Sequence, residues 1–151
     1  IKKISLELAR LKAQKISDLN KKILVVGSDT VISFNGKLLN KAKNINDAKK
    51  KIMLISGKKH FLYSSVSVFY NNKEIWKATQ KSTIQIRTLS EKEVDKYLEK
   101  TGKKILSSVG CYQAESLGPN IIESIKGDFF NVLGFPLFPF LNFLKKHKNN
   151  K

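Results

Sequence analysis

The chain has very few of the residues that usually bind metals or form cross-links. Its 151 residues include one cysteine, Cys111, and two histidines, His60 and His147. A single cysteine excludes a disulfide within the chain, and this Cys/His count excludes a structural zinc site of the usual kind. No motif beside Cys111 suggests a nucleophile, so we expect it to be a small buried residue.

Arginine is also scarce, although the chain is strongly basic. Arg10 and Arg87 are the only arginines in a sequence with a net charge of +17. Nucleic-acid interfaces tend to combine arginine with aromatic residues, whereas these lysines are scattered among Asn and Ile. We interpret the charge as a compositional bias that would favour a polyanionic small ligand such as a triphosphate. No specific nucleic-acid partner is expected, and a nucleic-acid binder remains a hypothesis based on charge alone.

No hydrophobic run is long enough to span a membrane. The most apolar stretch, residues 129–144, is interrupted by Gly134, Pro136 and Pro139, and it is shorter than the roughly 20 residues that a span requires. No signal peptide is visible at Ile1. We therefore expect one soluble, cytoplasmic domain over residues 1–151, with a core of ordinary size and no membrane partner.

Helical spacing and capping patterns predict several helices. Ile4, Leu8 and Leu11 recur at helical spacing and predict an amphipathic first helix. Asn46 is expected to cap the second helix, and a Ser-x-x-Glu capping box at residues 90–93 predicts the start of the third. The helices are expected at residues 2–17, 46–55, 91–100 and from 139 onward.

Alternating residues and turn signals predict several strands. Asn35–Gly36 is the strongest two-residue hairpin signal, and Asn71–Asn72 is expected to turn a second hairpin. Residues 121–125 are compatible with either a helix or a strand. Strands are expected at 23–27, 31–34, 37–39, 60–70, 73–76, 83–88 and 131–133. The fold class is therefore α/β, with a mixed, largely antiparallel twisted sheet and flanking helices.

A polar group, Ser28, Asp29 and Thr30, follows the apolar run at residues 23–26. A strand that ends on an acid can hold a carboxylate rigidly enough to position a metal or a water. Asp and Thr also favour turns, so the alternative role of these residues is to open a turn. The local sequence leaves both interpretations open.

Several short motifs occur in a characteristic order along the chain. They are Lys12-Ala13, Gly27-Ser-Asp-Thr-Val31, Gly36-x-x-Leu39-x-Lys41, Ile55-Ser-Gly-x-x-His60, Gly110-Cys-Tyr-Gln-x-Glu115-x-x-Gly118 and Ile125-x-Gly-Asp-x-x-Asn-Val-Leu-Gly-x-Pro-Leu137. In this order and spacing the set resembles the Maf family of nucleoside triphosphate pyrophosphatases, from about Leu8 to Leu144. No single motif is specific, but the ordered set is.

The resemblance implies a fold like that of the inosine triphosphate pyrophosphatases, with two lobes around a cleft. It also implies hydrolysis of a nucleoside triphosphate to the monophosphate and pyrophosphate, with a divalent metal cation, Mg²⁺ or Mn²⁺. The catalytic and metal-binding acid of the family falls on Asp29, and Thr30 falls on a substrate-site position. Lys12 and Lys41 match lysines that face the phosphates. Without the resemblance, each lysine would be read as a solvated surface charge.

Glu115 is the position that the resemblance connects with substrate choice. Family members that act on dTTP and UTP usually carry Gln there, which offers both a donor and an acceptor. An ionised Glu offers only acceptors, which suits the N–H groups of guanine. Glu115 therefore resembles the branch that acts on 7-methyl-GTP. A solvent-facing Glu is the alternative.

The chain departs from the family pattern at its beginning. Family members start with a strand and a Ser-x-Ser-x-Arg loop that supplies an Arg to the phosphates, and a Glu follows. Since neither occurs here, we expect the domain to be N-terminally incomplete and its activity to be affected. The alternative function is a non-catalytic nucleotide-binding or septum-formation-inhibiting protein. The resemblance also makes a homodimer possible.

Overall fold

The computed structural model describes residues 1–149, and the chain folds as two compact units. Unit 1 contains residues 1–30, 63–81 and the chain from 128 onward, and unit 2 contains residues 31–62 and 82–127. Strands β1 (Val25–Phe34), β3 (Lys59–Tyr70) and β4 (Lys73–Ile86) each contribute residues to both units.

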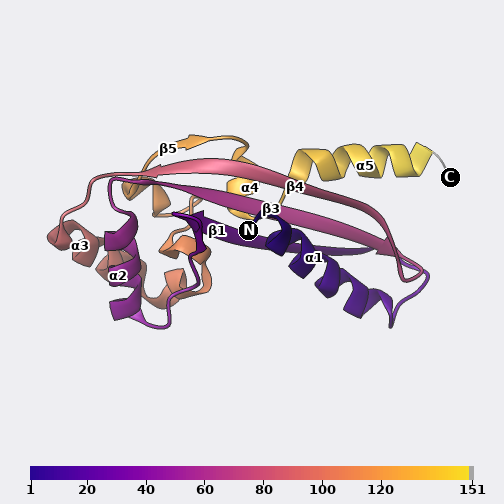
Figure 1. Ribbon diagram of the computed structural model, residues 1–151, viewed down its shortest axis with the longest axis horizontal. Helices are drawn as coiled ribbons and strands as arrows, with labels where there is room; N and C mark the ends of the chain where they lie inside the picture. The colour runs from indigo at the N-terminus through magenta and orange to yellow at the C-terminus, as the bar shows by residue number, and fades with distance from the viewer. Residues whose placement is uncertain (150–151) are drawn as a thin grey trace. The chain divides into compact units, whose positions relative to one another are not determined.

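Five strands form one sheet, in the order β2-β1-β3-β4-β5. Figure 1 labels four of them, β1, β3, β4 and β5. The short strand β2 (Lys37–Leu38) pairs antiparallel with β1, and β5 (Ile122–Lys126) pairs antiparallel with β4. Segment 121–125, which was compatible with either a helix or a strand, thus contributes most of a strand. The prediction of an α/β fold with a largely antiparallel sheet and flanking helices is confirmed.

Both predicted hairpin turns are confirmed. Asn35 and Gly36 have φ angles of 50° and 75°, and Asn71 and Asn72 have φ angles of 50° and 62°. Two consecutive positive φ angles match the twist of antiparallel strands, and Asn and Gly adopt them at low cost. These local signals therefore fixed the β1–β2 and β3–β4 connections.

Two predicted breaks between strands are wrong. Residues 23–27 and 31–34 were expected as separate strands, but β1 continues through Ser28, Asp29 and Thr30. Likewise, β4 continues across the polar residues between 76 and 83. Hydrogen bonds to neighbouring elements compensate for the polar side chains: the Thr30 hydroxyl lies 2.8 Å from the Ser64 hydroxyl, and the Ser65 hydroxyl lies 2.7 Å from that of Thr79.

The helices in unit 2 follow their caps. Helix α2 (Ile45–Ile55) is capped by Asn44, whose side chain accepts from the Asp47 N–H at 2.8 Å, so the prediction of Asn46 as the cap was wrong. The predicted capping box of α3 (Glu91–Thr101) is confirmed: the Ser90 hydroxyl accepts from Glu93 N–H, and the Glu93 carboxylate accepts from Ser90 N–H. Short 3₁₀ turns, η1 (Gly102–Ser107), η2 (Val109–Cys111) and η3 (Gly118–Asn120), follow α3.

The C-terminal segment of unit 1 is helical. Residues 131–133 were expected as a strand but lie in helix α4 (Phe129–Leu133). The Asp128 carboxylate caps α4 by accepting from Phe130 N–H at 2.7 Å, and Gly134 ends it with a φ angle of 116°. The predicted final helix, α5 (Leu137–Asn149), begins two residues earlier than expected.

Aromatic stacking attaches α5 to β4 within unit 1. The Trp76 and Phe143 rings stack with centroids 4.9 Å apart, and Phe140 lies beside both. Offset aromatic pairs of this kind add to the free energy gained by burial. None of the helices within residues 1–149 combines the length and apolarity that crossing a membrane would require.

Helix α1 (Lys2–Ser17) is present as predicted, but its orientation differs from that of an ordinary amphipathic helix. Such a helix turns its large apolar residues toward the core. Here Ile4, Leu8 and Leu11 are 37%, 40% and 49% exposed. The buried side consists of small residues at four-residue spacing, namely Ser5, Ala9, Ala13 and Ser17.

The small side of α1 allows a very close approach to β1. A Cβ atom on Gly27 would lie 2.3 Å from the Ala9 carbonyl oxygen and 2.9 Å from the Ala13 Cβ. Larger residues at these positions would therefore separate the helix from the strand. Size complementarity, rather than apolar character, determines which side of α1 is buried.

We predict that Gly27→Ala lowers the free energy of unfolding by about 1–3 kcal/mol, because the added methyl group must displace the α1 backbone. Chemical denaturation with circular dichroism measures the change. Val26→Thr, on an exposed neighbouring position of the same strand, is the control and should change stability by less than about 0.5 kcal/mol. Wild-type stability of Gly27→Ala would contradict the close packing.

A buried histidine makes the stability of unit 2 dependent on pH. The His60 Nε2 atom lies 2.9 Å from the Tyr112 hydroxyl, and His60 is 1% exposed. Burial lowers the pKa of His60 from 6.5 to about 4, because the charged ring would lose its hydration. The folded chain therefore resists protonation over a pH range in which the unfolded chain accepts a proton.

We predict that the contribution of His60 to stability is constant well above pH 6.5 and falls as the pH is lowered from 6.5 toward 4, by about 3 kcal/mol in total. Below the folded pKa both states carry the proton, and the contribution levels off. Urea denaturation at several pH values measures it. His60→Gln should lose this part of the pH dependence, and identical profiles for the two proteins would contradict the assignment.

Candidate active site

An ion pair joins α1 to β1 in unit 1. The Lys12 Nζ lies 2.6 Å from Asp29 Oδ1 and donates a longer hydrogen bond, of 3.3 Å, to the Ser28 carbonyl oxygen. The Asp29 side chain is 17% exposed and that of Lys12 is 59% exposed. The Asp29 carboxylate is thus mostly buried, whereas the long Lys12 side chain is mostly exposed and reaches the carboxylate from the solvent side.

The close contact between α1 and β1 explains this pairing. Side chains alternate along a strand, so Gly27 and Asp29 lie on the same face of β1. Gly27 contacts Ala9 and Ala13, and Lys12 immediately precedes Ala13 on the helix. Because α1 lies directly against Gly27, the Lys12 side chain can reach Asp29, two residues further along the strand.

Asp29 offers a partial set of metal ligands. Its Oδ2 atom has no hydrogen-bond or ion-pair partner among residues 1–149, and no group of three His, Cys, Asp or Glu side chains that could hold an ion occurs in this range. Mg²⁺ is often bound through only one or two carboxylates, with water and substrate phosphates as the other ligands. The residues present therefore fit a metal that arrives with a triphosphate better than one held in a protein cage.

Thr30 lies on the other face of β1 and serves a different set of contacts. Its hydroxyl is 2.8 Å from the Ser64 hydroxyl on β3 and 3.3 Å from the Gly134 carbonyl oxygen. Ser64 in turn donates to the Asn131 carbonyl at 2.8 Å. These bonds attach β1 and β3 to the turn that ends α4, so adjacent residues of one motif have separate surroundings.

The remaining two predicted site residues, Lys41 and Glu115, belong to unit 2. Lys41 is exposed in the connection between β2 and α2. Glu115 is exposed in a turn where the Gln113 carbonyl accepts from the N–H groups of Ser116 and Gly118, at 3.0 and 2.9 Å. This turn fixes the backbone on both sides of Glu115 and leaves its carboxylate in solvent.

Cys111 is fully buried, as expected. Burial raises the pKa of its thiol to about 11, because a thiolate would be poorly solvated there. A neutral thiol is a weak nucleophile at neutral pH. This agrees with the expectation that Cys111 has a packing role.

Sequence reasoning missed the role of Gly27 in building this site. The signal was present in the repetition of small residues, Ser5, Ala9 and Ala13, at four-residue spacing. Such a row marks a helix side that can approach a backbone closely, and a glycine in the next strand is its natural counterpart. The larger residues Leu8 and Leu11 obscured the row.

Comparison with known proteins shows the family of this chain. Residues 1–147 match the family described as Maf-like protein. A 7-methyl-GTP pyrophosphatase of Bartonella henselae is 38% identical over 140 residues, which cover 93% of this chain and 71% of that protein. A nucleoside triphosphate pyrophosphatase of Caulobacter vibrioides is 36% identical over 93% of this chain and 70% of its own length.

A third relative extends the same pattern. The 7-methyl-GTP pyrophosphatase of Rhizobium meliloti is 33% identical over 143 residues, which cover 95% of this chain and 72% of that protein. The resemblance noted in the ordered motifs is therefore confirmed over almost the whole chain. The chain belongs to the Maf family.

Proposed function

We propose that this protein is a hydrolase that converts a nucleoside triphosphate to the monophosphate and pyrophosphate. The carrying observation is the ion pair between Lys12 and Asp29, which places a fixed carboxylate beside a mobile cation. Membership of a family whose relatives are named pyrophosphatases supports the same reaction. Neither observation favours the alternative of a non-catalytic nucleotide-binding or septum-formation-inhibiting protein.

In this proposal Asp29 acts on the attacking water. The carboxylate orients the water and accepts its proton as the water oxygen forms a new bond to phosphorus. The anhydride bond between the α- and β-phosphates breaks, and pyrophosphate leaves with its bonding electrons. The position of Asp29 within a continuous strand supports this role, because both neighbouring residues are held by the sheet.

Lys12 stabilises the charge that builds up on the leaving pyrophosphate. A triphosphate competes with Asp29 for the ammonium group, and the long exposed side chain can move between the two partners. Lys41 is proposed as a second phosphate-facing cation, and Thr30 as a substrate-site residue, on the basis of their positions in the family motifs. A homodimer stays a prediction.

The proposed cofactor is a divalent cation, Mg²⁺ or Mn²⁺, held by Asp29 together with the substrate phosphates. When bound, such a cation supplies charge neutralisation at the phosphates. Asp29 is suited to this role because one of its carboxylate oxygens has no partner among the described residues.

Glu115 is proposed to select a guanine-type base, with 7-methyl-GTP as the candidate substrate. An exposed carboxylate can accept hydrogen bonds from the N1–H and the exocyclic amine of guanine, and it is attracted to the positive charge of a methylated ring. Two of the relatives described above are named 7-methyl-GTP pyrophosphatases, which supports this choice.

We predict that Asp29→Asn lowers kcat for triphosphate hydrolysis by about 10²–10⁴-fold, because an amide cannot accept the proton from water. Pyrophosphate release from a panel of dTTP, UTP, CTP, GTP and 7-methyl-GTP measures turnover. Asp18→Asn, which changes an exposed acid at the end of α1, is the control and should retain activity. Near wild-type turnover of Asp29→Asn would refute the role.

We predict that Glu115→Gln shifts preference from purine toward pyrimidine triphosphates, since Gln can donate to a pyrimidine carbonyl. The ratio of kcat/KM values for 7-methyl-GTP and UTP measures the shift. Glu123→Gln, an exposed change on β5, is the matched control. An unchanged ratio in Glu115→Gln would remove this residue from the account of specificity.

A further inference from the structure

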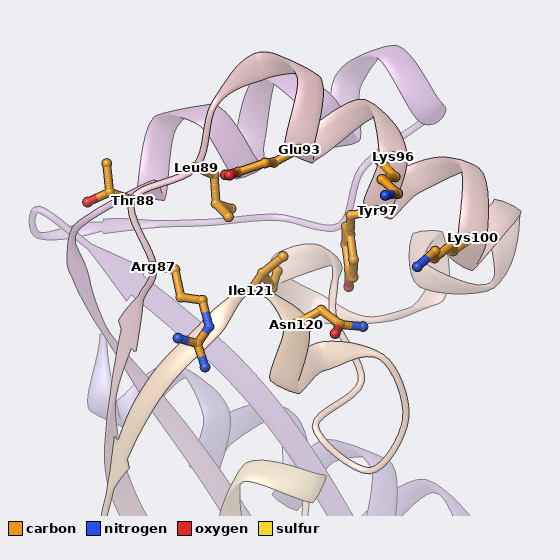
Figure 2. A pocket seen from close by; sticks show the side chains of 9 residues that line it. All are labelled: Arg87, Thr88, Leu89, Glu93, Lys96, Tyr97, Lys100, Asn120 and Ile121. Carbon is orange, nitrogen blue, oxygen red and sulfur yellow. The ribbon is translucent and has the colours of Figure 1, made fainter.

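A second concave surface lies entirely within unit 2. It is a pocket of about 300 Å³, formed by the chain segment after β4, one side of α3 and the turn η3 (Figure 2). This volume is at the lower end of the range typical of small-molecule sites. None of the five residues assigned to the triphosphate site lines it.

Three cations without an ion-pair partner among the described residues line this pocket. The side chains of Arg87, Lys96 and Lys100 have no hydrogen-bond or ion-pair partner within the part of the chain that the structure describes. Figure 2 shows the Lys100 ammonium and the Asn120 amide pointing into the space between α3 and η3, with Arg87 on the far side of Ile121. The pocket therefore presents donors from three separate segments.

Helical phase separates the charges of α3 into two groups. Glu91 and Asp95 are four residues apart, and each carboxylate lies 2.8 Å from the Lys49 Nζ on α2. These contacts raise the pKa of Lys49, with Asp95 as the larger cause. Lys96 and Lys100 lie on another side of the helix. Glu91 and Asp95 pair with Lys49 and therefore do not neutralise these two lysines.

The one acid that lines the pocket already has a structural role. The Glu93 carboxylate accepts from the Ser90 N–H at 3.0 Å as part of the capping box. It lies at the start of α3, beside Leu89, as Figure 2 shows, whereas Lys100 lies two turns further along. The end of the pocket near Lys100 and Asn120 is therefore the more positive one.

The base of the pocket is buried, hydrogen-bonded and partly apolar. Tyr97 and Ile121 are 5% and 1% exposed, and the Tyr97 hydroxyl donates to the Cys111 carbonyl at 3.0 Å. The Arg87 backbone is fixed on both sides, because its N–H donates to the Ile121 carbonyl at 2.8 Å and its carbonyl accepts from Gly57 N–H at 2.9 Å. The donors thus project from anchored backbone rather than from a loose loop.

We propose that this pocket is a second, non-catalytic site that binds a small phosphate-bearing ligand. The phosphate lies between Lys96, Lys100 and Asn120, and the rest of the ligand extends over Ile121 toward Arg87. Ammonium groups attract phosphate as point charges, and a guanidinium can bind an anionic oxygen pair in a bidentate manner. A pocket of this size favours a small ligand over a nucleic-acid strand, which requires an extended basic groove.

Two sources would supply the same chemistry, namely a nucleoside monophosphate and free pyrophosphate. The apolar lining of the pocket, which includes the half-buried Leu89, favours the monophosphate, because pyrophosphate has no group to place against it. The proposal does not depend on the reaction at Asp29, since the pocket residues belong to neither the acid nor its lysine partner.

The test is a titration of the full chain, without divalent metal, followed by backbone amide chemical shifts. One series uses GMP and another uses inorganic pyrophosphate. We expect saturable shifts at residues 96–101 and at Asn120 and Ile121, with a Kd of about 1 mM or tighter for at least one probe. Tighter binding of GMP identifies the nucleotide as the better ligand, and tighter binding of pyrophosphate identifies the free anion.

Matched double variants separate a site from general charge attraction. The variant Lys96→Gln/Lys100→Gln should weaken binding at least about tenfold, because charge-assisted hydrogen bonds are lost. The variant Lys92→Gln/Lys103→Gln removes the same charge from exposed positions that do not line the pocket, and it should bind like the wild type. Circular dichroism establishes that both variants are folded.

Three outcomes would overturn the proposal. They are the absence of saturable shifts with both probes, equal weakening in the two double variants, and shifts confined to the amides around Lys12 and Asp29. The last outcome would leave the proposed triphosphate site intact and remove only the second site. Conversely, loss of turnover in Asp29→Asn with pocket binding retained would show that the two sites are independent.

Discussion

The close approach of α1 to β1 at Gly27 is the constraint on which the arrangement of unit 1 depends. A Cβ at this position would overlap the Ala9 carbonyl, so the helix lies against bare strand backbone. The separation of the two elements determines whether a lysine side chain from the helix can reach an acid on the strand. A packing requirement between small residues therefore sets the geometry of the only ion pair in the candidate site, within the residues described.

Strand alternation gives the second organising rule. Asp29 and Thr30 are adjacent in the motif, but one contacts α1 and the other contacts β3 and the turn after α4. The acid is thus exposed to a movable cation, while the neighbouring hydroxyl holds several segments together. Motif residues that are consecutive in sequence need not share a task, and in a strand they seldom share a surface.

Sequence reasoning succeeded where the determinants were local. The Asn35–Gly36 turn and the Ser90 cap were predictable because each involves a few residues and a known backbone preference. It failed where distant elements decided the outcome: β1 continues through Asp29 as part of the sheet, and the Asp29 carboxylate pairs with Lys12, 17 positions away. The pocket beside Arg87 could not be predicted from the sequence either, because its hydrogen-bond donors come from separate segments that only the fold brings together.

The exposed apolar row of α1 influences how copies of this protein behave in solution. A net charge of +17 makes the molecules repel one another and keeps these rows apart at low ionic strength. In about 1 M salt the screening length contracts to about 3 Å, and the repulsion no longer acts across the distance between neighbouring molecules. Hydrophobic contact between the exposed side chains of different molecules is then no longer opposed; these side chains are Ile4, Leu8 and Leu11. The tendency of the protein to self-associate therefore depends on the ionic strength of the medium.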